Sequence, residues 1–200
     1  ELNYDNPNTN LEAAILTEDK QVVNAGTPVY TRALEGSISK TFNADNKMPI
    51  QVDVVSTRFA HDTPGKESGV RTYSNLGITR VLSEEFPIIT TRANVSSTFY
   101  RLDSSNNINR TIAGTGVDFA FPFISQGNLY GSEVNHTFTP KISYNYRAKE
   151  VQGNIPIFDT TDKYDDIITF ADLTSGERYT GLDRITNAND FTLSIESSHR

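Results

Sequence analysis

Bulky apolar residues alternate with polar or small residues along three stretches of the chain, at 117–123, 137–147 and 191–196. In the second stretch the apolar positions are Phe138, Pro140, Ile142, Tyr144 and Tyr146. Successive side chains of a β-strand point to opposite faces, so a period of two predicts strands with one apolar and one polar face. The pattern favours an all-β protein.

Five further segments are rich in Val, Ile, Thr and aromatic residues, and we predict strands at about 9–17, 29–42, 50–61, 70–82 and 90–102. Turn-forming residues interrupt the chain at 45–47, 63–65, 84–87, 104–107 and 126–128. These candidate strands are long for a globular sheet and start about every 20 residues. A β-sandwich more often shows short strands every 8–12 residues or so. The spacing therefore favours a barrel-like sheet of about eight to ten long antiparallel strands.

Residues 149–187 contain no convincing alternating run and predict one long loop. Five aspartates lie in its stretch 159–172, at 159, 162, 165, 166 and 172. Hard cations prefer such oxygen ligands, but the spacing does not match an EF-hand loop, so a solvated acidic loop is the favoured interpretation over an ion site. No linker divides the rest, and residues 1–200 are predicted to form one section of a single domain.

Composition supports the β prediction, because 23 Thr, 18 Asn and 17 Ser make up 58 of the 200 residues. The net charge of −7 and the absence of any basic run argue against a nucleic-acid partner. The chain has no cysteine, which excludes disulfides and thiol chemistry in these residues. It starts at Glu1 without a signal sequence, so we expect a mature product or an excised piece.

Membrane helices are not predicted, because the longest uncharged stretch is residues 119–132 and a spanning helix needs about 20 apolar residues. Strands of a membrane barrel alternate their faces and never show such a run, so a membrane location stays open. The alternating aromatic residues fit a soluble core or a lipid-facing band equally well, and ligand stacking less well.

No catalytic, cofactor or metal site is predicted. The three histidines, His61, His136 and His199, are isolated from one another, and no motif of a serine nucleophile or phosphate-binding loop occurs. A carboxylate pair for hydrolysis cannot be told from ordinary surface acids among 25 Asp and Glu. We therefore expect a protein that is not an enzyme.

A resemblance adds to this interpretation at residues 133–198. The strand 134–146 contains Thr137 and Pro140 in a T-x-x-P pattern, Ile155-Pro156-Ile157-Phe158-Asp159 follows as I-P-x-F-D, and Gly181-Leu182-Asp183-Arg184 precedes Ala188-Asn189. This order resembles the β-barrel of the LPS-assembly protein LptD family, also called organic solvent tolerance proteins. Tyr179-Thr180 and Thr186-Asn187 depart from the family's pattern.

The resemblance implies an interior section of the C-terminal barrel of a Gram-negative outer-membrane translocon, which inserts lipopolysaccharide into the outer leaflet. The implied partners are lipopolysaccharide, the lipid bilayer and an LptE-like lipoprotein in the barrel lumen. The strands of the lateral gate would lie outside this section. The family-motif residues are Pro140, Ile155, Pro156, Phe158, Asp159, Gly181, Asp183, Arg184 and Asn189. Candidate lumen-facing residues are Lys141, Asn145 and Arg147.

Two alternatives remain at this point: a soluble β-sandwich that binds a ligand such as carbohydrate, and a hydrolase with a buried carboxylate pair. A membrane section should leave Phe119, Phe121 and Ile142 uncovered on one sheet face, whereas a sandwich should cover them with a second sheet.

Overall fold

The computed structural model describes residues 2–20, 30–42, 48–129, 132–163 and 177–199, and these residues contain ten β-strands. The strands are β1 (Leu2–Asn6), β2 (Leu11–Lys20), β3 (Thr31–Phe42), β4 (Ile50–Ala60), β5 (Gly69–Ser83), β6 (Ile88–Leu102), β7 (Ile108–Ala120), β8 (Phe123–Leu129), β9 (Ser132–Arg147) and β10 (Ala188–His199). In this part of the chain, no helix has the length and apolar character needed to cross a membrane.

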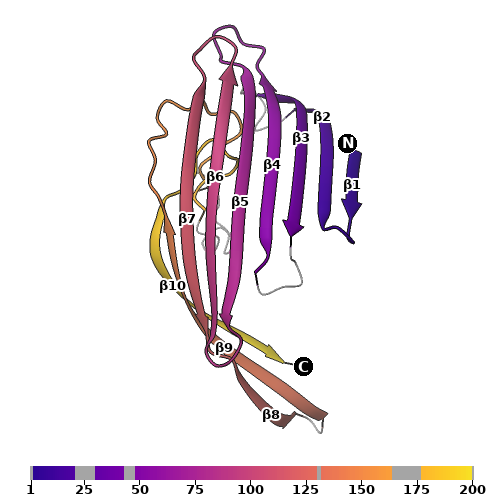
Figure 1. Cartoon of the computed structure of the whole chain (residues 1–200), viewed down its shortest axis with the longest axis vertical. Coiled ribbons are helices and arrows are strands. Elements are labelled where there is room, and N and C mark those ends of the chain that lie inside the picture. Colours follow the sequence, from indigo (N-terminus) through magenta and orange to yellow (C-terminus); the bar gives the residue numbers. More distant parts are fainter. Residues whose placement is uncertain (1, 21–29, 43–47, 130–131, 164–176, 200) are drawn as a thin grey trace.

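All ten strands belong to one antiparallel sheet, which is long, curved and open at both edges (Figure 1). The order is β1-β2-β3-β4-β5-β6-β7-β9-β10, and β8 pairs with β9. Strand β8 continues β7 in the same register, because Ala120 lies opposite Lys141 and Phe123 opposite Phe138. Pro122 divides them, since proline has no N–H to donate to a sheet ladder.

Connections at the two ends of the sheet differ in length (Figure 1). Residues 7–10 and 84–87 form short turns at the lower end. Residues 61–68 and 103–107, together with the described residues of the long connection 148–187 between β9 and β10, lie toward the upper end. Short turns at one end and longer loops at the other are typical of membrane barrels.

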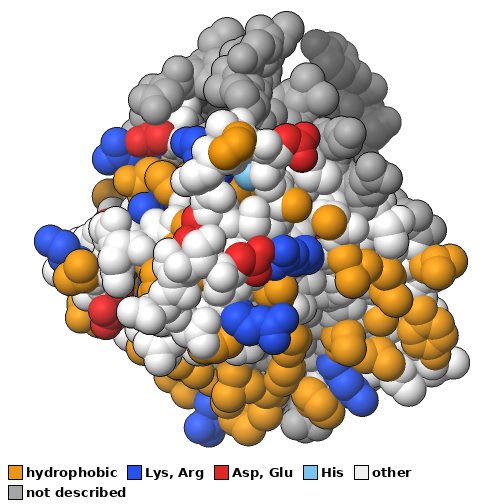
Figure 2. Space-filling view, turned by 90° about the horizontal axis from the view of Figure 1, so that it is seen from above, with side chains coloured by type: hydrophobic (Ala, Val, Ile, Leu, Met, Phe, Trp, Pro, Cys, Tyr) orange, Lys and Arg blue, Asp and Glu red, His pale blue; other side chains and the backbone are white. Residues whose placement is uncertain are grey.

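One face of the sheet is apolar and exposed. We call it the apolar face, and its exposed members include Leu34, Ile38, Val54, Leu76, Val95, Phe99, Phe138, Ile142, Phe191, Leu193 and Ile195. The register places them side by side, as Val52, Leu76 and Val95 show on three neighbouring strands. Figure 2, seen from the end that carries the long connection, shows hydrophobic side chains gathered along the lower and right margins of the molecule. Leu76 is 47% and Leu193 80% exposed, which in water would be an unusually large apolar surface.

The opposite, polar face carries the residues between these positions, including Asp53, Arg71, Asn75, Arg92, Asp118, Lys141 and Asn145. Side chains bond to one another across the strands here. Asp53, for example, accepts hydrogen bonds from Ser39 and Asn75. The alternation predicted from the sequence thus separates two surfaces of opposite polarity.

The predicted fold class is confirmed: the chain is all-β, with long antiparallel strands in an open sheet that is consistent with part of a β-barrel. No second sheet covers the apolar face in the described part of the chain, so the sandwich alternative finds no support. Ile142 is exposed, whereas Phe119 and Phe121 are half-buried. Phe121 packs against Phe86 of the turn 84–87, with ring centres 5.7 Å apart, and not beneath another layer.

One sequence prediction is wrong, and one strand was not predicted. The turn expected at 126–128 is wrong, because these residues lie in β8 and Gln126 and Gly127 pair with Asn135 and Val134 of β9. Pairing with a long partner strand overrides the turn preference of a Gly-Asn pair. Strand β1 was not predicted; five residues give too short a pattern to recognise. The expected turn at 45–47 lies outside the described residues.

Gly69 at the start of β5 offers a test of this packing. A Cβ there would lie 2.6 Å from the backbone oxygen of Arg101, whereas a Cβ at Gly36 in β3 would meet nothing within 4 Å. We expect Gly69→Ala to lower the free energy of unfolding by about 1–3 kcal/mol, through overpacking against a backbone that cannot move away. Gly36→Ala, the control, should be neutral or stabilising by up to about 1 kcal/mol. Urea titration of the two variants measures the difference, and equal midpoints would contradict the prediction.

Candidate functional site

The described residues of the connection 148–187 lie behind β5–β7 in Figure 1, on the side toward which β9 and β10 curve. Its described residues, 148–163 and 177–187, pack against the polar face near the long-loop end. Phe158, Ile155, Phe59 and Tyr100 form the buried hydrophobic cluster there. The loop and the sheet therefore meet at the main buried contact of the described residues.

Arg71 of β5 joins two carboxylates of this loop. Its Nη1 lies 2.6 Å from Asp159 Oδ1 and 2.9 Å from Asp183 Oδ1, and its Nη2 lies 2.7 Å from Asp159 Oδ2. The exposed fractions of the three side chains are 2% for Arg71, 2% for Asp159 and 0% for Asp183. We call this triad of Arg71, Asp159 and Asp183 the Arg71 lock. Its planar two-pronged contact with Asp159 is the strongest geometry available to an arginine–carboxylate pair.

Asp183 also organises the loop itself. Its Oδ2 accepts hydrogen bonds from the backbone N–H groups of Phe158 and Asp159, at 2.7 and 2.9 Å. Its Oδ1 accepts a bond from the Tyr100 hydroxyl of β6 at 3.1 Å, besides that from Arg71. One carboxylate thus holds the segment 158–159 in place and connects it to two strands.

Arg110 of β7 binds the loop through acceptors other than carboxylates. It donates to the carbonyl oxygens of Leu182 and Asp183, at 2.7 and 2.9 Å, and to Gln152 Oε1 at 2.8 Å. The same guanidinium donates to Thr98 of β6 at 3.0 Å. Buried carbonyl groups of the loop are therefore satisfied by the sheet, as buried polar groups must be.

Aromatic contacts shield the Arg71 lock from water. The ring of Phe158 stacks on Phe59 of β4 with centres 4.7 Å apart, and Tyr30 meets its edge at 5.0 Å. The Arg71 guanidinium lies 4.8 Å from the centre of the Phe59 ring. The apolar residues of the I-P-x-F-D segment thus cover the ion pair between Asp159 of the same segment and Arg71.

The two loop carboxylates differ in their proton affinity. Burial acts to raise the pKa of both, but hydrogen bonds and the positive charge of Arg71 outweigh it at Asp159, whose pKa lies below its usual value. At Asp183 burial, together with the charge of Asp159, outweighs Arg71, and the pKa is raised.

Gly181 is required where the two parts of the loop meet. Its φ is +65°, and a Cβ there would lie 2.5 Å from Asp159 Oδ1 and 2.7 Å from the Asp159 carbonyl oxygen. Only glycine allows this close approach. Gly181 thus permits Asp159 to reach Arg71 while Asp183 binds the backbone of residues 158–159.

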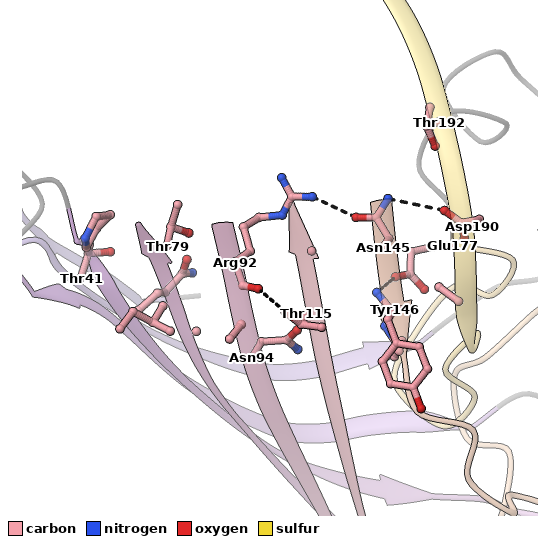
Figure 3. Close-up of a pocket in the computed structure, with 18 residues that line it drawn as sticks. Thr41, Thr79, Arg92, Asn94, Thr115, Asn145, Tyr146, Glu177, Asp190 and Thr192 are labelled. Carbon is pink, nitrogen blue, oxygen red and sulfur yellow. Dashed lines mark hydrogen bonds and ion pairs between the residues drawn. The ribbon is translucent and has the colours of Figure 1, made fainter. Parts of the chain in front are cut away.

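A separate polar cavity of about 420 Å³ lies lower on the same face, between β5–β7, β9 and β10 (Figure 3). Arg92 donates to Asn145 at 2.9 Å, and Asn145 donates to Asp190 at 3.5 Å. Arg147 pairs with Glu177 at 2.5 Å and donates to the Thr186 carbonyl at 2.9 Å. Each arginine of the cavity wall is balanced by a carboxylate, Arg147 by Glu177 and Arg92 by Asp118.

The family-motif residues fall into two groups. Asp159, Gly181, Asp183 and Arg184 meet at or beside the Arg71 lock, where Arg184 donates to the Ile155 carbonyl at 2.9 Å. Ile155 and Phe158 are buried in the hydrophobic cluster, and Pro156 is half-buried between them. Two residues lie elsewhere. The carbonyl of Pro140 in β9 accepts the Phe121 N–H at 2.9 Å, and Asn189 in β10 accepts the Tyr144 hydroxyl at 3.0 Å.

The three candidate lumen-facing residues lie on the polar face. Lys141 lies 3.5 Å from Asp118, and Asn145 and Arg147 line the cavity. Whether this face borders a barrel lumen is taken up below as part of the proposed function.

The prediction of a solvated acidic loop is wrong for Asp159, which is buried against Arg71. Asp162 pairs with Arg178 at 2.6 Å, and Asp165, Asp166 and Asp172 lie outside the described residues. In the part of the chain that the structure describes, no three His, Cys, Asp or Glu side chains are grouped to hold a metal ion. Neither Arg71 nor Arg110 is predicted as a site residue from the sequence, because the only signal of each is a polar position in a β-strand.

An exposed apolar face, a polar face and long antiparallel strands together define a section of the wall of a membrane β-barrel. Comparison with known proteins agrees. The family model described as "LptD: LPS transport system D" matches residues 16–199. The chain belongs to the LptD family.

Individual relatives named LPS-assembly protein LptD show the extent of the similarity. The protein of Neisseria gonorrhoeae is 28% identical over 153 residues, and that of Thiobacillus denitrificans is 30% identical over 145 residues. These matches cover 74% and 71% of this chain, but only 18% and 19% of the relatives. A relative from Pseudoalteromonas atlantica is 36% identical over 95 residues, which is 48% of this chain and 12% of that protein. The chain thus spans less than a fifth of the length of these relatives.

Asp183→Asn tests the Arg71 lock. An amide has one acceptor oxygen and one donor nitrogen, so it cannot accept bonds on both sides, from the backbone N–H groups and from Arg71 with Tyr100. We expect loop docking to weaken by about 1–3 kcal/mol, because the amide leaves at least one buried donor without an acceptor. Hydrogen exchange at the N–H groups of Phe158 and Asp159 measures the loss.

The matched control is Asp103→Asn, which removes the pair between Asp103 and Arg58, both largely exposed. Exposed pairs contribute about 1 kcal/mol or less, so exchange in the loop should stay at the parent rate. Equal protection of residues 158–159 in Asp183→Asn and Asp103→Asn would contradict the structural role of the Arg71 lock.

Proposed function

We propose that this chain is an interior section of the barrel wall of an outer-membrane translocon that inserts lipopolysaccharide into the outer leaflet of a Gram-negative cell. Residues 1–200 would act as a single section of the barrel domain. Its role would be structural and transporting, without catalysis. The observation that carries the proposal is the exposed apolar face on a sheet whose other face is polar and closely bonded.

The strand lengths suit a bilayer. Seven of the ten strands in the described residues are 11–16 residues long, from 11 in β4 to 16 in β9. A tilted strand needs about 9–11 residues to cross the hydrocarbon core, so these strands reach across it. Strands β3 to β6 have their backbone groups paired on both sides over most of their length, which a bilayer demands.

The polar face would border the barrel lumen. Arginine, lysine, amide and hydroxyl side chains there can contact water, a protein or the sugars and phosphates of lipopolysaccharide. Lys141, Asn145 and Arg147 would face an LptE-like lipoprotein inside the lumen. The name of the matching family, LPS transport system D, supports the substrate.

Paired lysine substitutions test the membrane part of the proposal. Leu76 lies on the apolar face, and the next residue, Gly77, lines the polar cavity, where a Cβ would meet nothing closer than 3.9 Å. In the full-length protein we expect Leu76→Lys to destabilise the barrel in a bilayer by about 2–4 kcal/mol if Leu76 lies near the midplane, less nearer an interface. Gly77→Lys should be tolerated. The measurement is the folded fraction of each variant in urea-titrated liposomes, and equal loss in both would contradict a lipid-facing Leu76.

Crosslinking tests the partner. A photo-reactive residue at Lys141 or Arg147 should form adducts with an LptE-like lipoprotein in cells, because these positions would point into the lumen. The control is Ile142, which follows Lys141 in β9 and faces the apolar side. Adducts with the lipoprotein from Ile142 alone, or from none of these positions, would contradict the proposed partner contact.

A further inference from the structure

The long connection reaches far across the sheet from its own strands. It leaves β9 at Arg147 and enters β10 at Ala188. Its Asp159 nevertheless contacts Arg32 at the start of β3, 3.3 Å away, as well as Arg71 of β5. Its Phe158 packs on Phe59 of β4. The loop therefore connects the β9–β10 side of the sheet with β3 and β4.

This connection is a chord across the curved wall. In the strand order, β10 lies six steps from β3, and neighbouring strands are about 4.8 Å apart, so the path along the sheet is about 29 Å. Hydrogen bonds along that path set the spacing of the strands but leave the bend between neighbours soft. A rigid contact between the two ends of the path fixes the bend instead.

The contact has the properties of a rigid one. The Arg71 lock is buried, and both loop carboxylates bind the same guanidinium, so the loop cannot shift without breaking charge-assisted hydrogen bonds. Arg110 adds two bonds to the carbonyl oxygens of residues 182 and 183 from a third strand. The loop is thus held on β5, β6 and β7 by polar bonds and on β4 by a stacked ring.

We infer that the docked connection is an internal brace that fixes the curvature of this section of the wall. Strand number and shear set the circumference of a barrel. They do not by themselves decide whether a large cross-section is round or flattened, and a chord from β10 to β3 does. The inference concerns shape alone and holds whatever passes through the lumen.

Two glycines of the same loop supply a matched pair of variants. Gly181→Ala would place a Cβ against Asp159 at a position with positive φ, which displaces Asp159 from Arg71. Gly153→Ala adds the same methyl group where nothing lies within 4 Å. Neither glycine lies in a strand, so both variants leave the sheet pairing intact.

The experiment measures a distance across the wall. Spin labels are placed at Ile38 of β3 and Leu193 of β10, both exposed on the apolar face, in the full-length protein in lipid. Pulsed electron resonance should give one narrow distance distribution for the parent and for Gly153→Ala. Gly181→Ala should give a broader distribution with a displaced mean. Hydrogen exchange at the N–H groups of Phe158 and Asp159, in the same samples, reports whether the loop is docked.

Asp159→Asn is the milder second variant, because it keeps the side-chain shape and removes the charge facing Arg71. In whichever variant the loop loses protection, the distance distribution must broaden with it. Loss of protection with an unchanged distribution would overturn the brace. So would a loop that stays protected in both Gly181→Ala and Asp159→Asn, since the Arg71 lock would then not be what holds it.

Discussion

The cost of removing charge from water governs how this chain is put together. Buried Arg71 is paired with the carboxylates of Asp159 and Asp183, and each carboxylate accepts a charge-assisted hydrogen bond from Arg71 in return. The three residues come from β5 and from two ends of one long connection, so they become compatible only when sheet and loop meet. Tyr100 and the N–H groups of residues 158–159 complete the set by occupying the remaining acceptor sites of Asp183. A docked loop is therefore favoured as a whole.

The same principle explains why the hydrophobic cluster is small and lies on the polar side. In a protein dissolved in water the apolar faces of the strands would pack together, but here Ile38, Leu76 and Leu193 remain exposed. In the proposed barrel wall, a hydrocarbon bilayer would provide for that face the apolar surroundings that a second sheet provides elsewhere. On the polar face, apolar side chains are shielded where the loop covers them. The buried apolar residues of the described chain therefore gather there, around Phe59 and Phe158.

Sequence pattern predicted the strands well because alternation depends only on neighbours along the chain. The stretches at 137–147 and 191–196 lie within β9 and β10, and the weaker candidates coincide with β2–β6 to within a few residues. The prediction of a turn at 126–128 was wrong because the length of the partner strand β9, which local sequence does not show, keeps these residues in β8. The prediction that Asp159 lies in a solvated loop failed for a similar reason. Asp159 looks like any acidic loop residue, and its partner Arg71 is 88 residues away. The family motif singled out Asp159 and Asp183 without showing what they bind.

Shielding decides how much such a charge contact is worth. Arg58 and Asp103 form a two-pronged pair at 2.7 and 2.6 Å, as close as that of Arg71 with Asp159, but both side chains are largely exposed. Water and salt screen an exposed pair, so its contribution is small. Phe158 and Ile155 keep water from the Arg71 lock, and both are held in place by the backbone bonds that Asp183 and Arg184 make. The shielding residues and Asp159 lie in the same segment, so the loop excludes water from the ion pair as it docks on the polar face. A strong ion pair thereby becomes possible on a surface that faces water.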